Sequence, residues 1–116
     1  MRRLWRAFIN SMRALRYLVR HEPAIQQEIG LFVLSIPLSF YVTSTYVTAF
    51  LLSGSILFLI LVEVLNTAIE AACNAVSREF DADIQLAKDC GSLAVLISVV
   101  LVGGLWIYAL LGRFVW

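Results

Sequence analysis

Two acidic and three uncharged polar residues recur within Glu63-Val-Leu-Asn-Thr-Ala-Ile-Glu-Ala-Ala-Cys-Asn74. In an α-helix successive residues turn by about 100°, which places all five on one stripe about 100° wide. The other residues of the segment are apolar or small. Carboxylates in apolar surroundings are costly, and they indicate either a functional site or a polar seam that joins helices in an oligomer. Two carboxylates on one stripe repel each other unless a cation or a proton lies between them. The stripe comprises Glu63, Asn66, Thr67, Glu70 and Asn74.

Four more charged residues flank the long apolar stretches of the chain. Glu22 and Glu28 precede the first stretch, and Lys88 and Asp89 precede the last one. Each alone is typical of a solvated helix end, but we expect all four to lie near the level of Glu70. Carboxylate and amide oxygens near a lysine suit a hard cation such as Mg²⁺, which proteins hold with one or two carboxylates together with substrate phosphates.

Other chemistries find little support in the sequence. A zinc site is disfavoured, because His21 is the only histidine and the two cysteines, Cys73 and Cys90, are not paired for zinc. Nothing near His21 indicates a Ser-His-Asp triad. There is no GxxxxGK[ST] or GxGxxG phosphate loop. No basic and aromatic surface for nucleic acid stands out. Nucleotide phosphates would therefore have to be held by metal and side chains.

The elements that must position these residues follow from the distribution of charge. The 116 residues are 61% hydrophobic and 15% charged, which disfavours a soluble domain and a disordered chain. No charged residue occurs between 29 and 62 or between 90 and 112. About 20 apolar residues span a bilayer core, and the segment 41–48 is read as a turn. We predict an all-α membrane protein, with residues 1–116 as one domain, transmembrane helices at 27–41, 46–65 and 91–111, and a cytoplasmic loop at 77–89.

The N-terminal segment 1–21 is predicted to be an amphipathic surface helix. Six of the nine basic residues fall in the first twenty positions, and five of these arginines lie in an arc of about 80°, opposite apolar residues. This pattern is typical of a helix at an anionic membrane surface. A signal peptide is disfavoured, because arginines interrupt the segment throughout. Since basic segments stay in the cytoplasm, the N-terminus is predicted inside and the C-terminus outside.

Two motifs carry a resemblance to a known family. Glu63-Val-Leu-Asn-Thr-Ala-Ile-Glu-Ala, followed by Ala87-Lys-Asp-Cys-Gly-Ser-Leu-Ala-Val-Leu96, resembles the prokaryotic integral-membrane diacylglycerol kinase family. The signature of that family is E, two hydrophobic residues, N-[ST]-A-I-E-A, and then AKD before the last helix. The resemblance covers essentially the whole chain. It implies a homotrimer with shared active sites in the bacterial inner membrane, which transfers the γ-phosphoryl group of ATP to diacylglycerol and produces phosphatidic acid.

The resemblance also implies roles for individual residues. Glu63 would be the general base for the lipid hydroxyl, and Glu22 and Glu70 would hold Mg²⁺ with the ATP phosphates. Two residues depart from the family pattern, since Asn74 stands where Asp is often found and Phe80 where Tyr is common. The implied ATP-binding residues are Arg3, Glu22, Glu70, Glu79, Phe80, Asp81, Lys88 and Asp89, and the implied lipid-binding residues are Arg3, Gln27, Glu63, Asn66 and Ser92.

Two alternatives remain at the level of sequence. An undecaprenol kinase of the same family would use the same chemistry on a different lipid, although Gly91-Ser92 after the AKD motif resembles the diacylglycerol branch more closely. A non-enzymatic oligomeric membrane protein, such as a small pore, would keep the polar seam but would need neither Lys88 nor Glu22.

Overall fold

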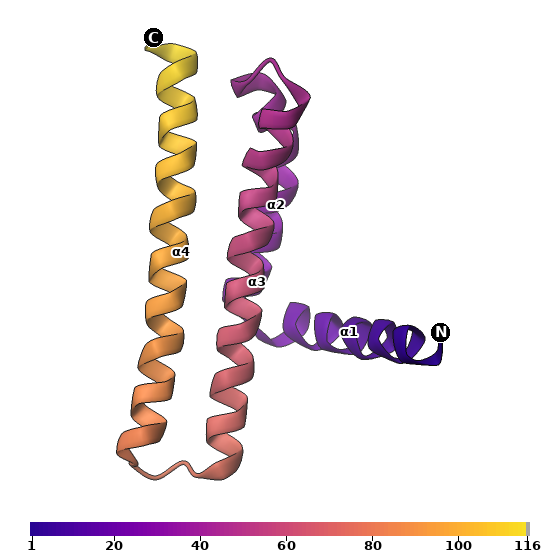
Figure 1. The fold of residues 1–116 in the computed structure, drawn as a ribbon, viewed down its shortest axis with the longest axis vertical. Helices are drawn as coiled ribbons and strands as arrows, with labels where there is room; N and C mark the ends of the chain where they lie inside the picture. Colours follow the sequence, from indigo (N-terminus) through magenta and orange to yellow (C-terminus); the bar gives the residue numbers. More distant parts are fainter. Residues whose placement is uncertain (116) are drawn as a thin grey trace.

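The computed structural model describes residues 1–115, which form four α-helices and no strand. The helices are α1 (Arg2–His21), α2 (Pro23–Val42), α3 (Tyr46–Val76) and α4 (Ala82–Phe114). Helices α2, α3 and α4 run lengthwise as a narrow bundle, whereas α1 lies crosswise and projects from the bundle (Figure 1). The predicted all-α class, with an N-terminal helix followed by three long apolar helices, is confirmed.

Helices α2, α3 and α4 are each long and apolar enough to cross a membrane, with 20, 31 and 33 residues. All three are longer than the sequence predicted. The first crossing was placed at 27–41, but α2 begins at Pro23, where proline fits the first helical turn because no backbone N–H is needed there. Helix α3 continues beyond the predicted crossing to Val76, as the helical stripe from Glu63 to Asn74 predicts.

The predicted loop at 77–89 is wrong over most of its length, since α4 begins at Ala82 and runs through the predicted third crossing, 91–111. Asp81 caps this helix, and its carboxylate accepts backbone hydrogen bonds from Asp83 N at 2.9 Å and Ile84 N at 3.2 Å. Such a cap stabilises a helix by about 1 kcal/mol. As a result, Lys88 and Asp89 lie on a rigid helix and not on a loop.

A single residue, Glu22, turns the chain from α1 into α2. Glu22 is extended, with φ −114° and ψ 104°, and it serves at once as the C-cap of α1 and the N-cap of α2. Its backbone N–H donates to Leu18 O at 2.9 Å, and Gln26 Nε2 donates to Val19 O across the corner at 2.7 Å. The corner thus places the carboxyl group of Glu22 where the crosswise helix meets the bundle.

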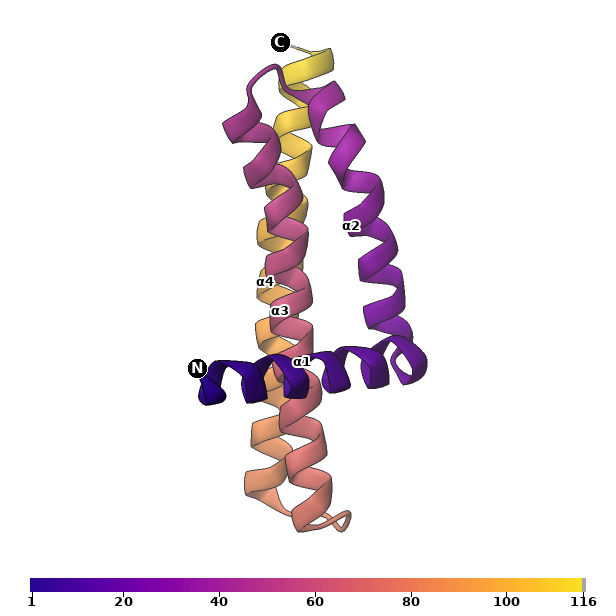
Figure 2. The ribbon, with the colours of Figure 1, turned by 90° about the vertical axis from the view of Figure 1, so that its right-hand side faces the viewer.

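Helix α3 lies between α2 and α4 and contacts both extensively, whereas α2 and α4 touch little. Ile56, Leu59 and Val102 form the buried core of the bundle. Trp106 ties α4 to α3, because its Nε1 donates to Leu52 O and to Ser55 Oγ, both at 3.1 Å. Figure 2 shows α1 crossing α3 in the half of α3 that leads to the α3–α4 loop.

The apolar side chains of α1 are mostly exposed, as expected for a helix that lies on a membrane. Leu18 is the one buried residue of this helix, while Leu4, Phe8 and Leu15 are 66%, 54% and 44% exposed. The location of α1 at a membrane surface stays a prediction.

Candidate active site

The stripe predicted from the sequence lies on one continuous helix, since α3 includes every residue from Glu63 to Asn74. A helix rises by about 1.5 Å per residue, so Glu63 lies about 26 Å and Glu70 about 36 Å along α3 from its start at Tyr46. A bilayer core is about 30 Å thick. Glu63 is half-buried and Glu70 is exposed, and a core that began at Tyr46 would end between these two residues.

Three other carboxylates, from three parts of the chain, lie within electrostatic range of Glu63. The carboxylate of Glu63 interacts electrostatically with those of Glu70 on the same helix and of Glu22 at the α1–α2 corner. Glu28, on α2, interacts in the same way with Glu63. This carboxylate cluster (Glu22, Glu28, Glu63 and Glu70) concentrates negative charge beside apolar helix surfaces. Like charges held this close favour binding of a cation.

Asn66 fixes the position of Glu70 from within the helix contact. It is 9% exposed, and its Nδ2 donates to Glu70 Oε1 at 3.3 Å. Its Oδ1 is buried without a hydrogen-bond partner in the described part of the chain. The backbone of Gly91 on α4 faces this oxygen so closely that a Cβ at position 91 would collide with it. A side chain at position 91 would therefore force Asn66 to turn or α4 to move away from α3.

Lys88 reaches the stripe from α4. Its Nζ donates to Asn74 Oδ1 at 2.9 Å, and both residues are partly buried. Asn74 lies one helical turn beyond Glu70 on α3. Because Asn74 is neutral, this hydrogen bond orients the ammonium group without cancelling its charge.

The α3–α4 loop holds three of the residues assigned to ATP. Glu79, Phe80 and Asp81 are all exposed, and Phe80 is 85% exposed. Asp81 acts as the cap of α4, as described above. Asp89 is exposed on the first turns of α4, where its Oδ1 accepts a hydrogen bond from Gln85 Nε2 at 2.9 Å.

Three other predicted residues are exposed in the single chain. Arg3 is near the end of α1 that projects away from the bundle (Figure 1). Gln27 on α2 and Ser92 on α4 are exposed. Ser92 follows Gly91 and therefore lies at the level of Asn66, but it is not turned into the same helix contact.

A groove of about 420 Å³ runs beside the stripe, between α1 and α3. Leu18 and Tyr17 line it from α1, and Val64 and Thr67 line it from α3. The Thr67 hydroxyl donates to Glu63 O at 3.0 Å. The groove therefore joins an apolar surface to the turn of α3 that carries Glu63.

The oxygen-rich donor set of the cluster fits a hard cation. No three His, Cys, Asp or Glu side chains within residues 1–115 are arranged to hold a metal ion by themselves. Mg²⁺ commonly binds to one or two carboxylates and completes its shell with phosphate oxygens and water. The buried Oε1 of Glu28 has no hydrogen-bond partner among the described residues, which adds an unused acceptor to this set.

Three residues of the site were given no role from the sequence: Glu28 was expected only near the level of Glu70, Asn74 only on the polar stripe, and Gly91 only as part of the second motif. Glu28 and Asn74 are polar and lay within the recognised patterns, but only the fold shows Glu28 near Glu63 and Asn74 bonded to Lys88. Gly91 gave no signal of its own, because a glycine in an apolar helix does not indicate what it faces.

Comparisons with a family model and with individual proteins point to the same family. The family model for prokaryotic diacylglycerol kinase matches residues 9–110. The chain is similar to a diacylglycerol kinase of Escherichia coli, with 32% identity over 90% of this chain and 85% of that protein. It is also similar to diacylglycerol kinases of Haemophilus influenzae, with 31% identity over 83% and 81% of the two chains, and of Pseudomonas aeruginosa, with 34% identity over 80% and 76%.

Proposed function

Because this chain belongs to the prokaryotic diacylglycerol kinase family, we propose that it transfers the γ-phosphoryl group of ATP to the hydroxyl of diacylglycerol, with phosphatidic acid and ADP as products. The observation that carries the proposal is the carboxylate cluster around Glu63, at the level where an apolar helix leaves the bilayer core. A lipid hydroxyl and a nucleotide can both reach this level.

Glu63 is proposed as the general base. A hydroxyl is a weak nucleophile, and a carboxylate within hydrogen-bond reach assists it by accepting its proton. The hydroxyl oxygen then forms a bond to the γ-phosphorus, while the bond from that phosphorus to the bridging oxygen of ADP breaks. The half-buried position of Glu63, near the edge of the bilayer core, supports this role because the glycerol backbone of a lipid lies at that depth.

Glu22 and Glu70 are the proposed ligands of Mg²⁺. Both carboxylates act on Glu63 electrostatically, and Asn66 holds Glu70 in place through its hydrogen bond. When bound, Mg²⁺ would neutralise the charge of the ATP phosphates, which is the main requirement of phosphoryl transfer. Glu28 supplies a further carboxylate on the other side of the cluster, where it interacts with Glu63.

Lys88 is proposed to contact the ATP phosphates as a point charge. Its hydrogen bond to the neutral Asn74 keeps the ammonium group on the cluster side of α4 with its charge intact. Asp89, Arg3 and the loop residues Glu79, Phe80 and Asp81 complete the proposed nucleotide site. Gln27, Asn66 and Ser92, again with Arg3, are proposed to support the lipid substrate.

We further propose that the chain works as a homotrimer with composite sites in the bacterial inner membrane. The support is that Glu70 is exposed in the single chain and that Arg3 lies far from the cluster, so that one chain alone encloses the site poorly. The six basic residues of the first twenty favour a cytoplasmic N-terminus, which would place the cluster and the α3–α4 loop in the cytoplasm as well.

Replacing either proposed metal ligand is expected to shift the dependence on Mg²⁺. Glu22→Gln and Glu70→Gln each remove one hard oxygen ligand, so the Mg²⁺ concentration for half-maximal activity should rise about tenfold, which corresponds to a loss of 1.4 kcal/mol of binding free energy. Titration of activity and of ATP binding with Mg²⁺ measures the shift. Asp83→Asn, which removes an exposed carboxylate outside the cluster, is the matched control. An unchanged midpoint in both active variants would place the metal elsewhere.

The proposed activity is tested with the purified protein, radiolabelled ATP and lipid acceptors in mixed micelles. Diacylglycerol and undecaprenol are assayed side by side, and we expect labelled phosphatidic acid as the main product. Preferential labelling of undecaprenol would assign the same chemistry to the other lipid. If neither lipid is labelled by protein that binds ATP, the proposed function is wrong.

A further inference from the structure

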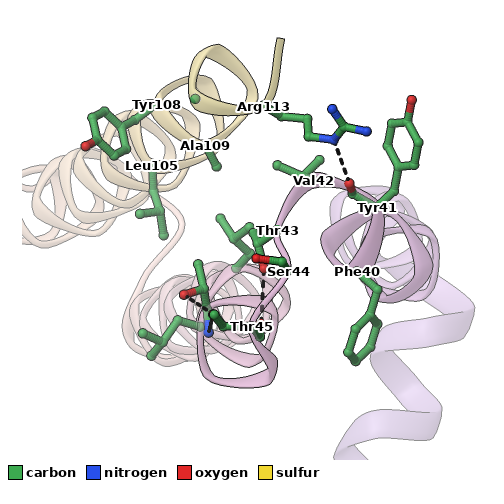
Figure 3. A pocket seen from close by; sticks show the side chains of 14 residues that line it. Phe40, Tyr41, Val42, Thr43, Ser44, Thr45, Leu105, Tyr108, Ala109 and Arg113 are labelled. Atoms are coloured by element: carbon green, nitrogen blue, oxygen red, sulfur yellow. Dashed lines mark hydrogen bonds between the residues drawn. The ribbon is translucent and has the colours of Figure 1, made fainter. Parts of the chain in front are cut away.

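A second hollow lies at the end of the bundle remote from the carboxylate cluster. It has a volume of about 780 Å³ and is formed by the α2–α3 turn and the last turns of α4. Its lining changes in character from one part to another: Thr43, Ser44 and Thr45 provide polar groups at the turn, whereas Leu51 and Leu105 line it with apolar surface along the helices (Figure 3).

Arg113 of α4 lines this hollow, and contacts with neighbouring residues hold its side chain in place. Its Nε donates to Tyr41 O at 3.2 Å, which joins α4 to the end of α2. The guanidinium carbon lies 5.1 Å from the centroid of the Tyr41 ring and 5.5 Å from that of the Phe114 ring. An arginine held in this way keeps its terminal N–H groups pre-organised for the oxygens of a carboxylate or phosphate.

No acidic side chain of the described residues neutralises Arg113 at this end of the molecule. Segments 29–62 and 90–112, which build this half of the bundle, contain no charged residue. Exposed aromatic residues gather around the same level, among them Tyr41 at 58% and Tyr46 at 83% exposure. Such aromatic residues are enriched where a membrane helix passes the lipid headgroups. The arginine therefore lies where lipid phosphates lie.

We propose that this hollow binds an anionic phospholipid of the leaflet opposite the carboxylate cluster. The phosphate group would accept hydrogen bonds from Arg113 and from the Ser44 hydroxyl, since the Thr43 and Thr45 hydroxyls donate within the turn. One acyl chain would lie against Leu51 and Leu105. The charge of Arg113 selects an anion, and the apolar lining selects a lipid over free phosphate. This site is separate from the proposed kinase site and does not depend on its assignment.

The test is native mass spectrometry of the full chain released from detergent micelles that contain dioleoyl phosphatidylglycerol. We expect a saturable lipid adduct whose affinity falls about tenfold in Arg113→Gln, since a hydrogen bond to a charged group is lost. Arg78→Gln, at the opposite end of the bundle, is the matched control and should bind the lipid as the unmodified protein does. Inorganic phosphate in excess should neither form the adduct nor displace the lipid.

A second variant separates binding of lipid from the structural role of Arg113. Ala109→Phe keeps the arginine and fills part of the hollow, so it should also weaken the adduct. Equal lipid binding in the unmodified protein, Arg113→Gln and Ala109→Phe would overturn the proposal. Displacement of the lipid by inorganic phosphate would also overturn it. So would a loss of lipid that occurs only when the number of chains per particle changes, because the hollow would then be an interface between copies.

Discussion

Glu63→Gln is expected to lower the single-turnover rate of phosphoryl transfer by about 10²–10⁴-fold, the usual contribution of a general base. Glutamine keeps the shape of the side chain but cannot accept the proton of the lipid hydroxyl. Lys88 and Glu70, which we assign to ATP and its metal, lie farther along the bundle, toward the α3–α4 loop. Binding of Mg-ATP should therefore persist.

Rapid-quench kinetics with saturating diacylglycerol measure the rate, and equilibrium binding of a non-hydrolysable ATP analogue measures the affinity. Asp83→Asn is the control for removal of an exposed carboxylate that does not belong to the cluster. A rate within about threefold of the unmodified protein would exclude Glu63 as the base, because so small a loss lies far below the range for such a group.

Gly91→Ala is expected to damage both stability and activity, although it adds only one methyl group. That methyl group would collide with Asn66 Oδ1, so either α4 must move away from α3 or Asn66 must turn away from Glu70. Overpacking of this kind costs about 1–3 kcal/mol of the free energy of unfolding, which the helix preference of alanine over glycine offsets by about 1 kcal/mol. Displacement of Asn66 also breaks its hydrogen bond to Glu70, so that catalytic turnover should fall together with stability.

Gly104→Ala is a closely matched control, because it makes the same substitution on the same helix at a position where a Cβ would meet nothing within 4 Å. Alanine favours a helix over glycine by about 1 kcal/mol, so this variant should be as stable as the unmodified protein or more so. Thermal unfolding in detergent and the kinase assay are measured on both. Equal behaviour of the two variants would show that α3 and α4 do not meet closely at Gly91.

The periodicity of polar residues was sufficient to place Glu63, Asn66 and Glu70 on one face of one helix. The prediction succeeded because those residues belong to a single regular element, in which spacing along the sequence determines direction in space. The number of helices that can span a membrane was predicted from two long uncharged stretches, the first of which is divided by a turn.

The ends of the helices and the contacts between them could not be predicted from the sequence. The charged run after Ser77 lies between two predicted crossings, so the sequence predicts a loop there. The cap at Asp81 instead begins α4 well before the predicted third crossing at 91–111. The bond from Lys88 to Asn74 joins residues 14 positions apart on two helices. It depends on how these helices are aligned across a short loop, and no local pattern records that alignment.

The difference in depth between Glu63 and Glu70 has a kinetic consequence. One reactant reaches the cluster by lateral diffusion in two dimensions, and the other arrives from the aqueous phase in three. The rate should then follow the mole fraction of diacylglycerol in the lipid surface and not its amount per volume. Dilution with inert lipid at a fixed total amount of diacylglycerol should slow the enzyme, while the apparent affinity for ATP stays the same. A kinase built in this way responds to the composition of its membrane, even where the total supply of substrate in the cell is constant.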